Sequence, residues 1–397
     1  MRGRILRFAI AVLIAALVVA LSAIITGCGG DATNSSGSGE SIRVGAIVSL
    51  TGTYAALGEA EKNALILEQD RINDAGGIDG RPLEIIIEDD GTDEAKAVAA
   101  AQKLINADEV IAIIGGSGTG STMAIRQAVE EAGIPQISMA GGSVVTETFS
   151  PNVYQTPWHN RLILGVLFAH LKAEGLDHIA LVTDAGSYGK DGRAMAVELA
   201  PGHDIDIEVD VTFNPGDTDM TGQVAQVLRN SEVEAVVVWN AGKEAPLFIK
   251  AAKLAGVQVP MFGGSGQARS EFIEGAGTDA EGYTIVTGRS FVLAWEQGSE
   301  GLTVNEDFAN RYAERWGATP DIFAGHAFDA VALLADGLGR AGQDADGEAL
   351  IAALDETSGV VGYAGTFDFS PTDHNGLSED DVTLITVRGG EFVALGQ

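Results

Sequence analysis

The segment Val110–Ala132 (VIAIIGGSGTGSTMAIRQAVEEA) decides the fold class, because it carries a strand, a turn and a helix in direct succession. Val110–Ile114 is an apolar run of strand length, and the turn Gly115–Thr122 that follows consists of glycine, serine and threonine. Ser121–Ala132 then shows a helical pattern. A strand that leads through a tight turn into a helix is the repeating unit of α/β proteins with parallel sheets.

The same unit recurs on both sides of this segment, and the pattern restarts at Trp158. Alternating strands and helices predict an α/β fold with largely parallel sheets, and the restart predicts two lobes with a cleft between them. In open sheets of this kind, ligands bind outside the carboxyl ends of the strands. The other expected strands are Ile42–Leu50, Leu83–Ile87, Gln136–Met139, His178–Thr183, Ile205–Phe213, Ala235–Trp239 and Pro260–Gly263, with Gly365–Phe369 and Val382–Val387 expected to be antiparallel.

The first 40 residues indicate export. Three arginines precede the apolar run Phe8–Ile25, and Ile25-Thr26-Gly27-Cys28 resembles a bacterial lipobox. We expect residues 1–27 to be a signal peptide, Cys28 to carry lipid, and residues 28–40 to form a flexible tether. The protein would then be anchored to the outer face of the cytoplasmic membrane, or lie in the periplasm. The alternative is an uncleaved anchor, which would also export everything after Cys28.

Composition and charge exclude several classes of protein. The 397 residues carry 56 Asp and Glu against 24 Lys and Arg, a formal charge of −32, which excludes a nucleic-acid binder that depends on phosphate contacts. The single cysteine excludes an intrachain disulfide and a multi-cysteine zinc site. The six histidines lack HExxH spacing, so neither a metal nor a cofactor is expected. The acidic excess favours adaptation to a saline habitat, where salt screens self-repulsion.

The turn Gly115–Thr122 is the first candidate binding site. Backbone N–H groups at a helix start point outward and favour an anion, and the hydroxyls of Ser117 and Thr119 add donors. A P-loop would need Lys where Ser121 stands, and a dinucleotide fingerprint would need Gly where Met123 stands. The turn therefore indicates a site for a modest anion such as a carboxylate. The alternative is a plain helix cap with solvent-facing hydroxyls.

Two further turns follow strands and face the expected cleft. In Ala140–Ser143 (AGGS), carbonyls at a strand end can accept from an ammonium or an amide, and Ser143 can donate. Asp184–Gly189 (DAGSYG) offers the ring of Tyr188 as a cover for a ligand. The alternative for the first turn is an ordinary loop, and for the second a hydrolase nucleophile elbow centred on Ser187.

A hydrolase would need more than the elbow. It would require a downstream acid and a histidine, for which His326 and His374 are available, but no oxyanion-hole loop is apparent. Trp239 and Asn240 end a strand that faces the cleft, where they belong either to the lobe core or to the ligand wall.

Several motifs carry a family resemblance that covers the chain from Ile42 onward. They are VGAIVSLTG at 44–52, AGGIDGRPL at 75–83, Asp89-Asp90, Ile114-Gly115, IPQIS at 134–138, Ser187-Tyr188-Gly189 and Phe367-Asp368. In this order they resemble the branched-chain amino-acid (Leu/Ile/Val) periplasmic substrate-binding proteins of ATP-driven importers, a type I family. The AGGIDGRPL block is the most specific of them.

The resemblance implies an architecture and a role. It implies two doubly wound parallel-sheet lobes joined by a three-strand hinge, which close on a ligand and then dock on the permease subunits of an ABC transporter. The N-terminal lobe would comprise 41–157 and 289–360, and the C-terminal lobe 158–288 and 361–397. Such a protein is a monomer without enzymatic activity, which captures an amino-acid-like, amide or carboxylate solute. The alternatives are a ligand sensor of the same fold that feeds a signalling partner, and a secreted hydrolase using Ser187.

The resemblance also implies roles for individual residues. Thr119 would hold the ligand carboxylate, and Tyr188 would cover the ligand from the second lobe. Ser265 stands where amino-acid binders of the family have an acid that pairs the ligand ammonium, and Ala241 stands at an aromatic position, so a standard α-amino acid is not favoured. An amide, a urea-like compound or a carboxylate without the amine fits better. The full expected ligand set is Ser117, Thr119, Gly141, Ser143, Tyr188, Asn240, Ser265 and Phe323.

Overall fold

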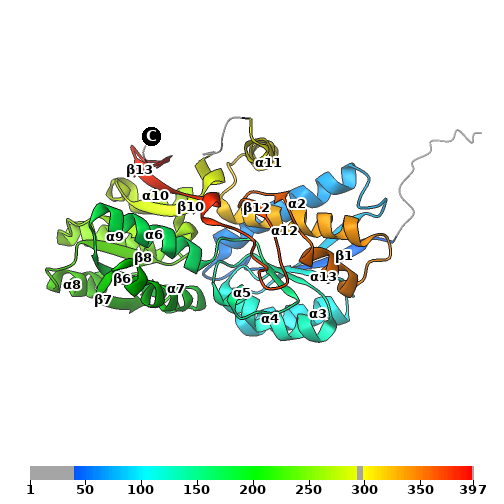
Figure 1. The fold of residues 1–397 in the computed structure, drawn as a ribbon, viewed down its shortest axis with the longest axis horizontal. Coiled ribbons are helices and arrows are strands. Elements are labelled where there is room, and N and C mark those ends of the chain that lie inside the picture. Colours follow the sequence, from blue (N-terminus) through cyan, green and yellow to red (C-terminus); the bar gives the residue numbers. More distant parts are fainter. Residues whose placement is uncertain (1–39, 293–297, 396–397) are drawn as a thin grey trace, which may run out of the picture. The chain divides into compact units, whose positions relative to one another are not determined.

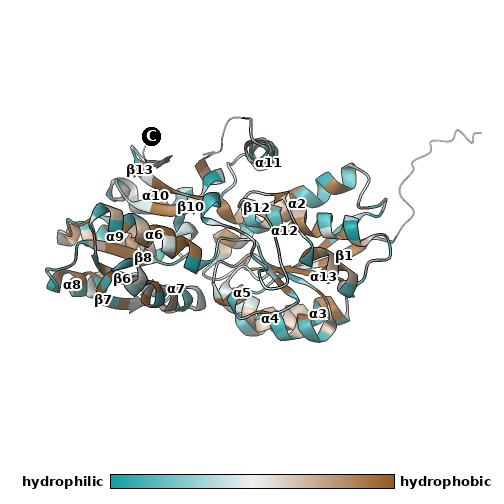
Figure 2. Cartoon of the chain, viewed as in Figure 1, coloured by the Kyte–Doolittle hydropathy of each residue, from teal (hydrophilic) through white to brown (hydrophobic). Residues whose placement is uncertain are grey.

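The computed structural model describes residues 40–292 and 298–395. The expected signal peptide, the lipidation site Cys28 and the tether up to residue 39 lie outside the described residues. The described part contains two large sheets, each of which forms the centre of a lobe (Figure 1). Figure 2 shows that the strands of both sheets are predominantly apolar, while many of the surrounding helices carry one apolar and one polar face.

The first lobe is built on a five-stranded, entirely parallel sheet of order β2-β1-β3-β4-β5. Its strands are β1 (Ile42–Val48), β2 (Leu83–Asp89), β3 (Ile113–Gly115), β4 (Gln136–Ser138) and β5 (Val153–Gln155). Between them run α2 (Ala55–Asp74), α3 (Glu94–Asn106), α4 (Thr119–Ala132) and α5 (Val144–Glu147). Local chemistry sets the helix ends: the Asp93 side chain accepts from Lys96 N at 2.9 Å to start α3, and Gly133 ends α4 in the left-handed conformation.

The second lobe repeats this order and adds an antiparallel edge. Its seven-stranded sheet has the order β14-β13-β10-β9-β8-β6-β7, so the parallel part runs β7-β6-β8-β9-β10. Its strands are β6 (His178–Asp184), β7 (Asp206–Phe213), β8 (Ala235–Trp239), β9 (Met261–Gly263), β10 (Thr284–Gly288), β13 (Val382–Arg388) and β14 (Glu391–Ala394). Its helices are α6 (Asn160–Glu174), α7 (Ser187–Leu199), α8 (Thr221–Arg229), α9 (Glu244–Ala255) and α10 (Ser270–Ala276).

The C-terminal third returns to the first lobe before it completes the second. The elements after β10 are α11 (Glu300–Trp316), α12 (Ile322–Ala341), α13 (Gly347–Asp355) and the antiparallel pair β11 (Val360–Val361) and β12 (Thr366–Phe367). Figure 1 shows α12, in orange, beside the blue α2, against which it packs along its length. α12 is long and apolar enough to span a membrane by composition, but 78% of its apolar window is buried, so it is a core helix of the lobe.

The segments that connect the lobes are bound to one another. His374 O accepts from Gln155 N at 2.9 Å, and the Asn375 side-chain amide donates to Pro157 O at 2.8 Å. The Trp158 indole donates to Ala364 O at 2.8 Å. Residues that are far apart in the sequence are therefore held together by hydrogen bonds where the chain passes between the lobes.

These observations confirm the expected α/β fold with two largely parallel sheets. The strand expected at Val110–Ile114 is shorter than its apolar run, because only Ile113–Gly115 pairs with its neighbours. The antiparallel strands expected near the C-terminus are confirmed as β12 and β13. The division of the chain at residues 157, 288 and 360 stays a prediction.

We predict that Gly288→Ala lowers the free energy of unfolding by about 1–3 kcal/mol, because overpacking forces neighbouring groups to move. A Cβ at Gly288 would lie 2.0 Å from Cζ2 of the buried Trp158 ring. The measurement is urea denaturation. The matched control is Gly165→Ala in α6, where a Cβ meets nothing within 4 Å and the protein should be equally stable or slightly more stable. Equal stability of the two variants would contradict this packing.

Candidate ligand-binding site

The sheet order positions the site. In each lobe the order reverses between the first and third strand, at β1/β3 and at β6/β8. Crevices open at such points outside the carboxyl ends of the strands. The turn after β3 leads into α4, and the turn after β6 leads into α7. Both turns contribute residues to one cavity, and the cavity therefore lies between the two sheets.

The cavity is narrow and partly open to solvent. No Asp, Glu, Lys or Arg occurs among the described residues that line it. The lining consists of Tyr54, Leu57, Ser117, Gly118, Thr119, Met139, Gly141, Pro157, Tyr188, Ala241, Ser265, Gly266, Ile322, Phe323 and His326. Six of the eight residues expected from the sequence are among them: Ser117, Thr119, Gly141, Tyr188, Ser265 and Phe323.

The start of α4 supplies hydrogen-bond donors. Gly118 precedes the helix and no side chain caps it. Thr119 is 2% exposed and its hydroxyl has no hydrogen-bond partner. Ser117 differs, because its hydroxyl accepts from Ser49 N at 2.9 Å and donates to Glu61. The helix N-terminus and the Thr119 hydroxyl together can bind a carboxylate.

Aromatic rings form much of the opposite wall. Tyr188, in the first turn of α7, stacks on Trp239 with ring centroids 6.4 Å apart and planes 14° apart. The Tyr188 hydroxyl lies close to the Ser265 side chain, and burial raises the pKa of Tyr188, so the phenol is neutral. The Trp239 indole donates to Asn160 Oδ1 at 3.0 Å. Trp239 is absent from the cavity lining and supports Tyr188 from behind, so it belongs to the lobe core.

His326 lines the cavity in a role that the sequence analysis did not anticipate. It is 2% exposed, its Nδ1 has no hydrogen-bond partner, and burial lowers its pKa to about 3. The imidazole is therefore neutral at pH 7. Its helix, α12, starts at Asp321, whose side chain accepts from Phe323 N and Ala324 N at 3.0 and 2.9 Å. Tyr54, which directly precedes α2, and Leu57 and Ile322, which lie in helices, were also missed, because an apolar or aromatic residue carries no local signal that it faces a ligand.

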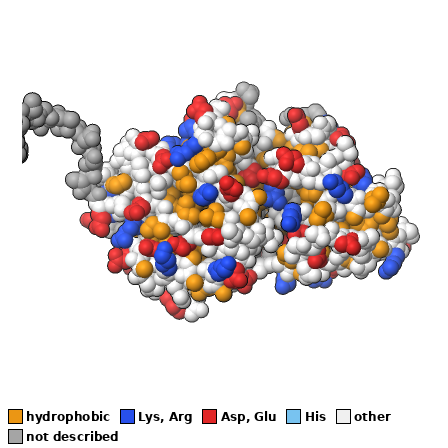
Figure 3. All heavy atoms as spheres, turned by 180° about the vertical axis from the view of Figure 1, so that it is seen from behind, with side chains coloured by type: hydrophobic (Ala, Val, Ile, Leu, Met, Phe, Trp, Pro, Cys, Tyr) orange, Lys and Arg blue, Asp and Glu red, His pale blue; other side chains and the backbone are white. Residues whose placement is uncertain are grey.

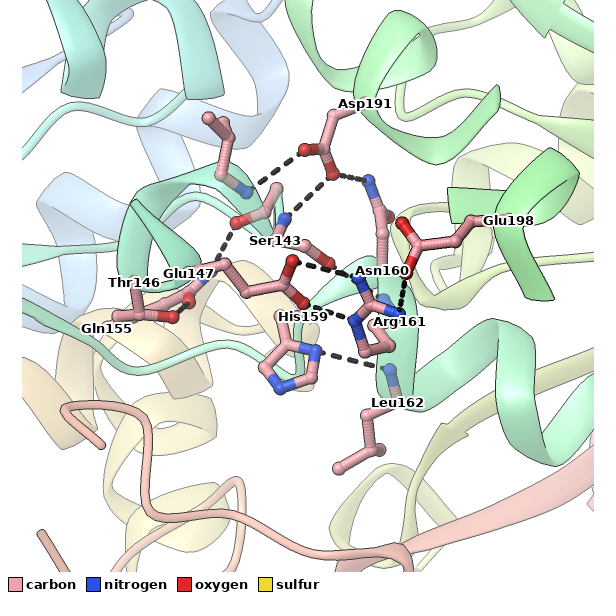
Figure 4. Close-up of polar contacts among 12 residues, drawn as sticks. Ser143, Thr146, Glu147, Gln155, His159, Asn160, Arg161, Leu162, Asp191 and Glu198 are labelled. Carbon is pink, nitrogen blue, oxygen red and sulfur yellow. Dashed lines mark hydrogen bonds and ion pairs between the residues drawn. The ribbon is translucent and has the colours of Figure 1, made fainter. Parts of the chain in front are cut away.

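Two expected ligand residues lie outside the cavity lining, and their polar groups bond within the protein. Ser143 N donates to Asp191 Oδ2 at 2.7 Å, and its hydroxyl accepts from Arg161 N at 2.8 Å (Figure 4). Asn240 donates to Glu244 Oε2 at 3.1 Å and accepts from Gln267 Nε2 at 3.1 Å. These bonds give both residues positions in the support of the site rather than in its lining.

Polar contacts bridge the two lobes beside the cavity. Figure 4 shows Asp191 of α7 between the start of α5 and the start of α6, where it also accepts from Asn160 Nδ2 at 2.7 Å. Arg161 lies between Glu147 and Glu198 in the same view and pairs with both. The Ser187 hydroxyl donates to Glu94 Oε1 at 3.2 Å, which joins α7 to α3. The lobes are therefore in direct contact along α7.

The nucleophile elbow is not assembled. Ser187 bonds to Glu94, whereas His326 lies in the cavity lining with Nδ1 unpartnered. His374 bonds to Val153 O at 3.0 Å and stacks on Tyr154 at 4.3 Å. In the described residues no histidine is hydrogen-bonded to Ser187, so the Ser-His pair of a nucleophile elbow is not formed.

One side-chain group has the composition of a metal site. His178, Asp206 and Glu208 offer ligand atoms that all lie within 4.8 Å of one another. They lie at the amino-terminal ends of β6 and β7, which is the opposite end of the sheet from the cavity. His178 Nδ1 already bonds to Glu208 at 2.8 Å, and this bond raises the pKa of His178.

The surface is mixed in charge on the face that Figure 3 shows, where acidic and basic side chains are interspersed.

Comparison with known proteins identifies the family. Residues 41–391 match the family described as periplasmic binding protein. The chain belongs to this family. Among curated members it is similar to the leucine-, isoleucine-, valine-, threonine- and alanine-binding protein of Pseudomonas aeruginosa, with 27% identity over 349 residues that span 86% of each chain. It is also similar to the Leu/Ile/Val-binding protein of Escherichia coli, with 27% identity over 280 residues, 68% of this chain and 73% of the relative.

Solved structures of periplasmic binding proteins share the architecture. An extracellular ligand-binding receptor from Rhodopseudomonas palustris superimposes with a TM-score of 0.83 at 27% identity, over 90% of this chain and 100% of its own. The substrate-binding protein of a branched-chain amino acid transporter from Streptococcus pneumoniae, in complex with isoleucine, gives 0.79 at 25% identity, over 89% and 98%. These findings confirm the resemblance and the type I fold that the sequence predicted. The names of these relatives describe binding proteins, which supports a non-enzymatic role for this chain.

We predict that Ser143→Ala destabilises the protein by about 1 kcal/mol and leaves ligand affinity unchanged, because its hydroxyl accepts from the start of α6. Urea denaturation and calorimetric titration measure the two quantities. A loss of affinity without a loss of stability would place Ser143 in the ligand shell after all.

We predict that His326→Gln changes how stability depends on pH. The unfolded chain binds a proton at this histidine below its ordinary pKa of 6.5, whereas the folded protein does so only near a pKa of about 3. The wild type therefore loses stability as the pH falls below 6.5, by about 2 kcal/mol between pH 7.5 and 5.0 from this group. The variant lacks this loss, so its unfolding free energy should gain that amount relative to wild type at pH 5.0. If the unfolding free energies of the variant and of the wild type change with pH in parallel, the result would contradict a buried neutral imidazole.

Proposed function

We propose that this periplasmic binding protein is the extracytoplasmic solute receptor of an ABC importer. It captures a small amino-acid-like, amide or carboxylate solute between its lobes and delivers it to the permease, without chemical conversion. Lipid on Cys28 holds it at the outer face of the membrane. The observation that carries the proposal is that Thr119 of the first lobe and Tyr188 of the second border the same cavity.

The proposed ligand set follows from the lining and from the free donors. Thr119 and the start of α4 bind the polar end of the solute, Tyr188 and Phe323 cover its body, and Gly141 lets the solute approach the backbone. Ser117 and Ser265 complete the polar rim. Each residue contributes from one lobe or the other, so a ligand gains its full set of contacts only when the lobes are together.

In this arrangement, solute binding is coupled to the contact between the lobes, which distinguishes the loaded protein from the empty one. A solute that contacts both lobes stabilises the arrangement in which they touch, because it binds that form better than the open one. The protein contacts along α7, Ser187 with Glu94 and Asp191 with the start of α5, form in the same arrangement. We propose that the permease recognises this closed form.

We predict that Thr119→Val weakens solute binding by about 1–3 kcal/mol, because the hydroxyl is buried without a partner in the protein and is proposed to bond to the solute. The solute is the compound with the largest thermal shift in a screen of amino acids, amides, ureas and carboxylates. Valine preserves the shape of the side chain, so the unfolding free energy of the solute-free protein should not fall.

The matched control is Thr303→Val on the exposed surface of α11, which should leave affinity unchanged. Wild-type affinity in Thr119→Val would refute the assignment of this cavity as the binding site. A screen in which no small solute shifts the melting temperature would refute the receptor function itself.

A further inference from the structure

We propose that the solute is a monocarboxylate with an apolar body and no ammonium group, such as a 2-oxo acid or an alkyl or aryl carboxylate. This inference rests on the proposed function and narrows its solute class. The cavity provides donors for one anionic group at one end, apolar surface around the body, and no acidic side chain in its described lining.

The donors converge on one end of the cavity. The uncapped start of α4 presents backbone N–H groups, and the Thr119 hydroxyl beside them is buried without a partner. A buried donor without an acceptor is costly, so such a group in a ligand cavity indicates what the ligand brings. A carboxylate brings two acceptor oxygens and a negative charge that a helix N-terminus favours.

None of the nearby acids is among the described lining residues of this cavity, and Glu94 lies beside Gly120 of α4 in an adjoining pocket. Asp184 accepts from Gly186 N at 2.7 Å, and Asp321 caps α12. Glu61 binds the Ser117 hydroxyl and lies behind it, outside the lining, and burial raises the pKa of Glu61 well above its ordinary value, which favours the neutral acid. An ammonium group in the cavity would lose its hydration and gain no counter-charge among the lining residues.

A buried cation stands behind the wall instead. Arg269 is 8% exposed, and its guanidinium carbon lies 5.8 Å from the centre of the Phe323 ring. It donates to Ala241 O at 3.1 Å, so it contacts two residues of the lining. Its positive charge favours an anion in the cavity, and Asp321, Asp184 and Glu244 act in the opposite direction. At Tyr54 of the lining, the effect of Asp184 and of Glu244 exceeds that of Arg269.

The body of the solute meets an apolar enclosure. Leu57, Met139, Pro157 and Ile322 line the cavity together with the rings of Tyr188 and Phe323. The Tyr188 hydroxyl has the Ser265 side chain close by as a polar neighbour within the protein. A hydrocarbon chain or an aromatic ring therefore matches the apolar chemistry of this lining without leaving a polar group of its own unpaired.

The test compares solutes of one skeleton that differ only in the polar end. Calorimetric titration of the purified exported part uses 4-methyl-2-oxopentanoate, 4-methylpentanoate, L-leucine and 4-methylpentanamide, and a second series uses phenylpyruvate, 3-phenylpropanoate, L-phenylalanine and 3-phenylpropanamide. We expect at least one carboxylate to bind about tenfold or more tightly than the amino acid and the amide of its series. Thr119→Val should remove most of that preference.

Ser265→Asp with Ser265→Asn as its matched control provides the second arm. The aspartate places a carboxylate in the lining, so it should weaken binding of the carboxylates and strengthen binding of the amino acids, whereas the asparagine, of the same shape, should do neither. If Ser265→Asp does not fold, the preference of the wild-type protein for the carboxylate over the amino acid and the amide still tests the inference.

The outcomes separate the two claims. If an amino acid or an amide binds as tightly as its carboxylate, and Thr119→Val weakens that binding, the monocarboxylate inference is overturned and the receptor function stands. No binding of any carboxylate also overturns the inference. Carboxylate binding that Thr119→Val does not affect overturns the assignment of the cavity itself.

Discussion

The proposed binding site depends on one constraint, that the first turn of a helix has more N–H donors than acceptors within reach. At the start of α4 the chain leaves this imbalance uncorrected, because Gly118 has no side chain to cap the helix. α3 and α12 are capped by Asp93 and Asp321, whereas α7 starts, like α4, at a glycine without a side-chain cap. Thr119 adds a buried hydroxyl without a partner to the same place. The unmatched donors cost stability in the empty protein, and a ligand can satisfy them.

The two-lobed architecture places the unmatched donors of α4 beside a cavity. Two sheets of the same strand order each open a crevice at their carboxyl ends, and the crevices share one cavity. The connecting segments are bound together by the hydrogen bonds of His374 and Asn375 to the stretch at 155–157. Because the connections lie side by side, relative motion of the lobes is restricted to changes near these segments, which is what a receptor that closes on its ligand requires.

The contrast between the surface and the cavity is informative about the ligand. The chain carries a formal charge of −32, yet no charged side chain occurs in the described lining. Asp191 and Arg161, which lie near the cavity, are committed to contacts that join α7 to the first lobe and the start of α6. In the proposed site, selectivity would therefore rest on backbone donors, hydroxyl groups and shape rather than on ion pairing.

The sequence by itself determined the α/β units, their repetition in two lobes, the turn that carries Thr119 and the turn that carries Tyr188. These depend on short-range periodicity and turn chemistry, which are local. Only the tertiary structure decided that Ser143 is satisfied by Asp191 and Arg161 whereas Thr119 is not. It also decided that His326 faces the cavity. The physical reason is that satisfaction and burial depend on partners tens to hundreds of residues away, which no local pattern encodes.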